Sequence, residues 1–228
     1  MSGLLHFSEH TLQEAALVFM AIIYFLRIRW YLSFPPAKER QPATGQGDTN
    51  PKKGSRYSLA NIVMPWAMES TRTKPLMYAQ FVVFHIGVAA SISLSFIIPY
   101  SPGLLDSGGF TALLQLLTGA AFIVGVMRII RRVSNIHIRA ISSPDDYFSL
   151  ALLTVWFAFA FLAAPNDISG GEGILLTYFI LTAFFLAYVP FSKISHYLYY
   201  PFTRFYLGKH FGRRGVYPVR RKPAVESR

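Results

Sequence analysis

Residues 76–98 have the sequence LMYAQFVVFHIGVAASISLSFII, which contains no Asp, Glu, Lys or Arg. As an α-helix this stretch would be about 34 Å long, enough to cross the roughly 30 Å of hydrocarbon in a membrane. Four more apolar blocks of 18 residues or more lie at residues 11–34, 110–130, 147–164 and 174 to about 200. The sequence therefore predicts an all-α integral membrane protein, a bundle of five transmembrane helices.

The overall composition agrees with a membrane protein. Of the 228 residues, 53% are hydrophobic and 14% are charged, whereas a soluble domain has about 25% charged residues. The mean hydropathy is +0.36. The first apolar block is not expected to be a cleavable signal, because no basic region precedes it and Arg27 and Arg29 follow it. All five blocks are therefore counted as membrane spans.

The basic residues predict how the chain crosses the membrane. All 22 Lys and Arg residues fall in segments that five successive helices would place on one side, at residues 27–74, 128–139 and 193–228. The charged residues in the segments on the other side are all acidic; they are Glu9, Asp106, Asp167 and Glu172. By the positive-inside rule the N-terminus is expected outside and the C-terminus in the cytoplasm, in the cytoplasmic membrane of a prokaryote. We therefore attribute the net charge of +11 to the orientation of the chain in the membrane, and no nucleic acid partner is expected.

Two histidines lie within apolar spans, where a polar side chain needs a partner. His85 is in the second block, and His196 is late in the fifth, which runs in the opposite direction, so both are expected in the cytoplasmic half. Two neutral imidazoles from separate helices can be the axial ligands of a haem iron. One b haem held by His85 and His196 is the main hypothesis. A neutral histidine hydrogen-bonded to a neighbouring helix is the alternative for each residue.

Other residues add little further chemistry. The other four histidines are expected at the membrane surfaces, although a ligand or proton-relay role for His10 stays open; they are His6, His10, His137 and His210. Lys193 and Arg128 are candidate cationic partners for haem propionates. The chain has no cysteine, so it cannot itself hold an iron–sulfur cluster by thiolates. No phosphate-binding GxxxxGK[ST], HExxH or GxSxG motif is present.

Three short motifs resemble a known family of membrane cytochromes. They are FHIG at residues 84–87, PFSKISH at 190–196 and ISSPDD at 141–146. Together with the five-helix, N-outside plan, they are similar to the gamma-type cytochrome b subunit of respiratory nitrate reductase. They are also similar to the membrane cytochromes of heterodisulfide-reductase-like and dissimilatory sulfite-reductase-associated complexes. The resemblance implies that His85 and His196 are haem ligands, and that the entry to the fourth helix is cytoplasmic.

The chain also departs from the two-haem members of that family. Those members carry a second histidine in each of the two helices, and here Ser95 and Tyr178 occupy the corresponding positions. The resemblance thus implies that the haem nearer the cytoplasm is kept and the outer one is lost, unless a residue such as His10 replaces a ligand. The quinone site is left open, because the family's site lies beside the outer haem.

These observations lead to an expected organisation. The outer N-terminus and first helix occupy residues 1–34, a cytoplasmic loop 35–75, the haem-binding bundle 76–200 and a basic cytoplasmic tail 201–228. Residues 57–68, inside the loop, are apolar enough to lie on the membrane or on a partner.

The expected function is electron transfer between a membrane quinone, such as menaquinone, and a cytoplasmic iron–sulfur protein. The resemblance implies that this partner is heterodisulfide-reductase-like or nitrate-reductase-beta-like. The alternatives are a haem-free membrane anchor of a redox complex and, third, a small transporter. The transporter is disfavoured because acidic residues are mostly in loops.

Overall fold

The computed structural model describes residues 2–36, 38, 40–44 and 50–219. Parts of the predicted loop at 35–75, and the end of the predicted basic tail beyond residue 219, lie outside the described residues. The regular secondary structure of the described residues consists of α-helices and 3-10 helices, and no strand is found among them. The predicted all-α class is therefore confirmed.

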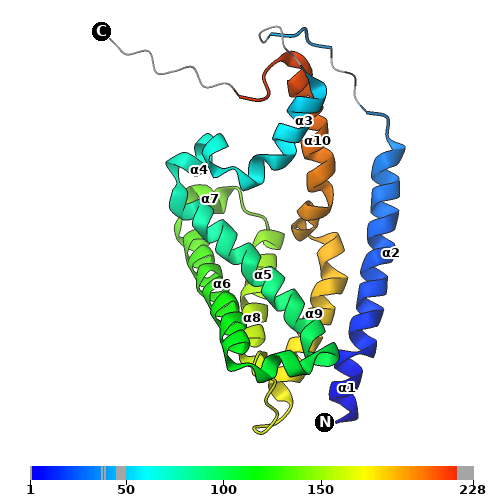
Figure 1. Cartoon of the computed structure of the whole chain (residues 1–228), viewed down its shortest axis with the longest axis vertical. Coiled ribbons are helices and arrows are strands. Elements are labelled where there is room, and N and C mark those ends of the chain that lie inside the picture. The colour runs from blue at the N-terminus through cyan, green and yellow to red at the C-terminus, as the bar shows by residue number, and fades with distance from the viewer. Residues whose placement is uncertain (1, 37, 39, 45–49, 220–228) are drawn as a thin grey trace. The chain divides into compact units, whose positions relative to one another are not determined.

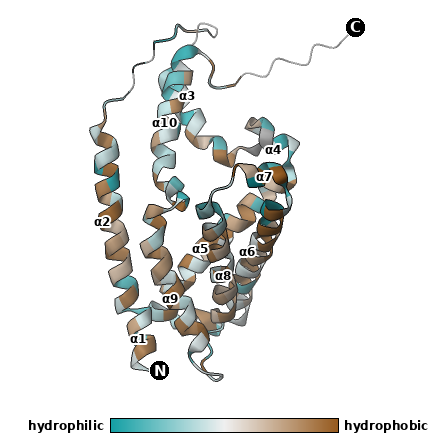
Figure 2. Cartoon of the chain, turned by 180° about the vertical axis from the view of Figure 1, so that it is seen from behind, coloured by the Kyte–Doolittle hydropathy of each residue, from teal (hydrophilic) through white to brown (hydrophobic). Residues whose placement is uncertain are grey.

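Five helical stretches in the described residues are long and apolar enough to cross a membrane. They are Gly3–Ser33, Pro75–Tyr100, Gly108–Ser134, Pro144–Ala163 and Gly173–Phe191. The first combines α1 (Gly3–Glu9) and α2 (Thr11–Ser33); the next three are α5, α6 and α8; the last contains α9 (Gly173–Tyr188). Figure 2 shows apolar residues dominating α2 and α9. A multi-pass membrane protein with five candidate spans is thus the class that this fold defines.

The chain divides into two compact units. Unit 1 consists of Met1–Trp30 and Ala79–Ser195, and unit 2 of Tyr31–Tyr78 and His196–Arg228. In the sequence, unit 2 contains 15 of the 22 basic residues and 4 of the 11 acidic ones, a formal charge of +11. Unit 1 balances 7 basic residues with 7 acidic ones. The whole net charge of the protein therefore belongs to unit 2.

Aromatic residues of α8 and α9 form the centre of unit 1. The indole of Trp156 is 1% exposed and stacks on Phe185, with ring centroids 5.0 Å apart. Its Nε1 donates a hydrogen bond to Thr182 Oγ1 at 2.8 Å. The Tyr178 hydroxyl, also fully buried, donates to the carbonyl of Ser91 in α5 at 2.6 Å. Each buried polar group in this set thus has a partner, as a low-dielectric interior requires.

Close helix contacts in unit 1 depend on two glycines. A Cβ on Gly87 of α5 would lie 2.1 Å from Ala121 Cβ of α6. A Cβ on Gly125 of α6 would lie 2.4 Å from Thr154 Oγ1 of α8, and α6 and α8 lie side by side in Figure 1. These glycines therefore serve helix packing. The shorter elements of unit 1 are η3 (Pro102–Asp106) and α7 (Ile136–Ala140).

The sequence predicted that the fifth apolar block is one helix to about residue 200, and this prediction is wrong. The α9 helix ends at Tyr188 and is followed by two 3-10 turns, η4 (Val189–Phe191) and η5 (Lys193–Ser195). Pro190 has no N–H to continue the helical ladder, and Ser192 is extended, with φ −100° and ψ 170°. His196 is consequently the first residue of a new helix, α10 (His196–Arg214), and not a late residue of the fifth span.

Unit 2 is built on the contact between α3 (Pro51–Ala60) and α10, which lie side by side in Figure 1. Asn50 caps α3 by accepting hydrogen bonds from the N–H groups of Lys52 and Lys53, at 3.0 and 3.2 Å. The turns η1 (Asn61–Val63) and η2 (Pro65–Ala67) and the short α4 (Glu69–Thr73) follow. The segment 57–68 thus forms the end of α3 and these two turns.

Candidate haem-ligand site

His85 is on the exposed side of α5, near the middle of a candidate span. Its Nδ1 lies 2.7 Å from the carbonyl oxygen of Phe81, one helical turn earlier, and the two rings are 4.2 Å apart. A carbonyl can only accept, so Nδ1 carries the proton in this contact, and in a neutral ring Nε2 then carries the lone pair. Histidines that bind metals commonly hold their other ring nitrogen in this way.

The neighbouring residue Phe84 faces the interior of unit 1. It is 6% exposed and makes an edge-to-face contact with Phe157, with centroids 5.1 Å apart. The Arg128 guanidinium of α6 lies 4.8 Å from the Phe84 ring centroid, a cation–π distance. Arg128, a sequence candidate for a propionate partner, therefore lies against Phe84, the residue that precedes His85 in α5.

His196 is exposed at the start of α10, and its ring makes an edge-to-face contact with Tyr197 at 6.4 Å. It belongs to unit 2, whereas His85 belongs to unit 1. His196 also follows the end of the candidate span Gly173–Phe191.

Hydrogen bonds and an ion pair join the turns just before His196 to the start of α8. The Lys193 Nζ lies 2.6 Å from Asp146 Oδ2 and donates to Ser143 Oγ at 2.8 Å. The Lys193 N–H donates to Asp145 Oδ2 at 3.0 Å, and the Tyr188 hydroxyl donates to Asp145 as well. Lys193, the other sequence candidate for a propionate partner, is thus engaged with Asp146.

The motif ISSPDD also caps α8. Both the N–H and the Oγ of Ser143 donate to Asp146 Oδ2 at 2.8 Å. The pattern Ser-x-x-Asp is a sequence signal for such a cap. The pairing of Asp146 with Lys193 crosses 47 residues and has no local signal in the sequence.

Asp146→Ala is expected to lower the free energy of unfolding in detergent micelles by about 1 kcal/mol, because the cap of α8 is lost. Lys193→Met is expected to cost less than about 0.5 kcal/mol, because an exposed ion pair contributes little. The Lys193 side chain is 59% exposed. Denaturation midpoints of the two variants measure the difference. A larger loss for Lys193→Met would show that the ion pair, and not the cap, is the main contribution.

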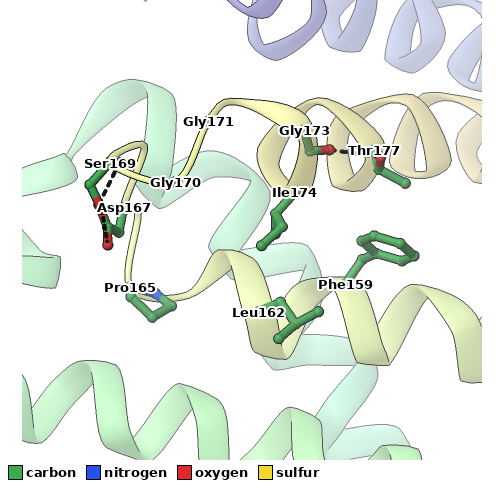
Figure 3. Close-up of a pocket in the computed structure, with 10 residues that line it drawn as sticks. All are labelled: Phe159, Leu162, Pro165, Asp167, Ser169, Gly170, Gly171, Gly173, Ile174 and Thr177. Atoms are coloured by element: carbon green, nitrogen blue, oxygen red, sulfur yellow. Dashed lines mark hydrogen bonds between the residues drawn. The ribbon is translucent and has the colours of Figure 1, made fainter.

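A hollow of about 640 Å³ lies beside the loop that joins α8 to α9. Figure 3 shows Phe159 and Leu162 of α8 and Ile174 of α9 beside it, with Asp167 and Ser169 in the loop. The N–H and Oγ of Ser169 donate to the Asp167 carboxylate at 2.8 and 2.9 Å. These bonds favour the ionised form and hold the pKa of Asp167 below its usual range. The hollow therefore combines apolar side chains with a polar, negatively charged edge.

Two further histidines, near the N-terminus, form a small cluster in unit 1. The rings of His6 and His10 are 4.7 Å apart, and His10 makes an edge-to-face contact with Tyr100 at 5.4 Å. Glu9 is 5% exposed, with a carboxylate oxygen 3.8 Å from His10 Nε2. The sequence analysis placed Glu9 in the outer N-terminal segment, and no sequence pattern indicated that its side chain is buried. The remaining two, His137 and His210, lie in α7 and α10.

No group of three or more His, Cys, Asp or Glu side chains in the described ranges could hold a metal ion. This finding bears little on a haem, since the porphyrin supplies four ligands and the protein supplies only the axial ones.

A comparison with known proteins finds a distant relative. A protein from Nitratidesulfovibrio vulgaris (strain Hildenborough) is 29% identical over 162 residues, which cover 68% of this chain and 70% of that protein. Its name states no activity, ligand or partner. No family model matches the chain, and no solved structure matches it.

Proposed function

We propose that this protein is the membrane cytochrome b subunit of a respiratory oxidoreductase complex. One b haem with His85 and His196 as axial ligands transfers electrons between the quinone pool and a cytoplasmic iron–sulfur protein. The protein crosses the cytoplasmic membrane with its N-terminus outside.

The observation that carries the proposal is the hydrogen bond from His85 Nδ1 to the carbonyl oxygen of Phe81. It fixes the tautomer whose Nε2 lone pair can bind iron, and it orients the ring from the backbone of the same helix. Because His85 is exposed on a candidate span, its ring faces outward from unit 1 into a region without bulk water. An apolar macrocycle such as haem suits these surroundings.

The protein's own residues would hold and tune the haem. His85 and His196 would supply the axial nitrogens, and Arg128, whose guanidinium lies against the Phe84 ring, would be a candidate partner for a haem propionate. Haem supplies one-electron transfer when bound, and its potential depends on the axial ligands, burial and hydrogen bonding. The bond to the Phe81 carbonyl increases the basicity of Nε2, which strengthens a bond to iron.

The hollow beside Asp167 is our candidate for the quinone site. Its apolar wall suits an isoprenoid chain, and its polar edge suits a ring with two oxygen atoms that exchange protons. The hollow lies in unit 1, as His85 does.

The iron–sulfur partner is proposed to dock on unit 2. This unit holds the entire net charge of +11, and electrostatic complementarity would guide an acidic protein toward it. The partner would be heterodisulfide-reductase-like or nitrate-reductase-beta-like, as the sequence resemblance implies.

One observation favours the second candidate function, a haem-free membrane anchor of a redox complex. His196 follows the candidate span and starts a separate helix, instead of lying within the fifth span as expected. In an anchor, His85 would be satisfied by its contacts within the membrane, and unit 2 would only recruit the soluble partners.

A pyridine haemochrome spectrum of the full-length protein, purified from native membranes with its partners, separates the two functions. About one b haem per chain is the expected result. Two haems per chain would mean that an additional ligand set exists, which would contradict the single His85–His196 site. A preparation with its partners present and no haem would overturn the cytochrome and leave the anchor.

A further inference from the structure

Unit 2 has an apolar groove of about 750 Å³. Its walls include Tyr31, Phe34, Leu59, Phe202 and Phe205. The rings of Tyr31 and Phe202 are 5.7 Å apart. Phe34 and Phe205 are 56% and 54% exposed, so a large apolar surface is open at this place. Exposed apolar surfaces of this kind mark places where lipids, ligands or proteins bind.

The groove begins where a candidate membrane span ends. Tyr31 is in the last turn of α2, and Phe34 is the first residue after that helix ends at Ser33. The end of a membrane-spanning helix lies at the boundary between hydrocarbon and lipid headgroups. A bound molecule at this place can extend an apolar part toward the hydrocarbon and a polar part toward water.

Two arginines are close along the chain to residues that line the groove. Arg204 lies between Phe202 and Phe205 on α10, and its Nε donates to the carbonyl of Ser58 at 3.2 Å, next to Leu59. Arg56 is exposed on α3, one turn before Leu59. Glu69 is the only acidic residue in the part of unit 2 that the structure describes. The groove therefore lies in a strongly basic part of the chain, with Arg56 and Arg204 close to its lining residues in the sequence.

We infer that this groove binds one anionic phospholipid, with an acyl chain between the aromatic side chains and the phosphate against Arg56 and Arg204. The apolar walls match an acyl chain, and the two arginines match a negatively charged headgroup. A quinone has the apolar part without the charge, and a zwitterionic lipid has no net charge to match. The site goes beyond the proposed electron transfer and does not depend on haem.

The test uses the full-length protein in bilayers of equal parts phosphatidylglycerol and phosphatidylcholine. The protein is extracted in mild detergent, and the lipids that remain bound are measured by native mass spectrometry. We expect about one retained phosphatidylglycerol per chain, enriched roughly tenfold over phosphatidylcholine, because two arginines contribute. Equal retention of both lipids would overturn the inference.

Variants separate charge from packing. Arg56→Gln combined with Arg204→Gln is expected to remove the enrichment, and Arg204→Lys, which keeps the charge, is expected to retain it. The matched control, Arg131→Gln with Arg139→Gln in unit 1, removes the same charge and should leave the enrichment unchanged. An equal loss in the control would show that the lipid follows total charge, which contradicts a built site.

Two further outcomes would also count against the lipid. Displacement of phosphatidylglycerol by added menaquinone would assign the groove to a quinone. Loss of phosphatidylglycerol on addition of an acidic partner protein would assign it to protein docking. A preparation with its partners present that lacks haem but still retains the lipid would leave this inference intact and overturn only the proposed cytochrome function.

Discussion

The His85→Ala protein is expected to lose the alpha band of b haem from its reduced-minus-oxidised spectrum. The substitution removes one of two axial ligands, and an imidazole bond to iron has no substitute in alanine. The band should fall to background at an unchanged amount of protein in the membrane. The protein itself should stay folded, because His85 is exposed and is not part of the buried core of unit 1.

Other histidines supply the controls for this experiment. His196→Ala is expected to give the same loss, although it lies in the other unit. His137→Ala and His10→Ala should keep the band, since neither is an axial ligand in the proposed site. Survival of the band in both His85→Ala and His196→Ala would show that other residues bind the haem. Loss of the band in His10→Ala would make that residue a ligand instead.

Gly54→Ala is expected to separate α3 from α10. A Cβ at this position would lie 2.3 Å from the Gly208 carbonyl oxygen and 2.5 Å from Gly212 Cα. Both atoms belong to the backbone, so no side chain can move aside. Overpacking of this kind costs about 3 kcal/mol. Hydrogen–deuterium exchange should show that the amides of α3 lose their protection, while those of α8 keep it.

The direction of this effect makes the test sharp. Alanine in a helix is ordinarily more favourable than glycine by about 1 kcal/mol. Gly109→Ala in α6 is the matched control, because a Cβ at Gly109 would meet no atom within 4 Å. It should leave exchange unchanged or slightly slower. Wild-type protection of α3 in Gly54→Ala would show that the close contact of α3 with α10 does not stabilise unit 2.

The membrane spans were predictable because they depend on local composition. A run of apolar residues long enough to cross hydrocarbon is visible without any tertiary information. The helices α2, α5, α6 and α8 begin and end within four residues of the predicted blocks, although the first candidate span also includes α1, and the fifth block differs. The break there had a partial signal in Pro190. The orientation of the two ends stays a prediction.

The part of the fold that was not predictable depends on contacts between distant residues. The pairing of Lys193 with Asp146 and the close approach of Gly54 to Gly208 join segments that share no periodicity. From the sequence alone, Gly54 falls in the predicted loop and Gly208 in the predicted tail, whereas Asp146 and Lys193 fall within the predicted bundle. For the candidate site, the sequence identified His85 as a polar residue in an apolar run, but the orientation of its ring toward Phe81 needed coordinates.

The contact between α3 and α10 also sets the order in which the protein can be completed. Ser55 Oγ donates to the carbonyl of Phe205, 150 residues later, at 3.3 Å. During synthesis α3 is made before four of the candidate spans. The side of α3 that carries Gly54 therefore cannot pack against α10 until α10 leaves the ribosome. Unit 2 therefore assembles last. A molecule that recognises the paired helices would therefore bind only chains whose candidate membrane spans have all been made.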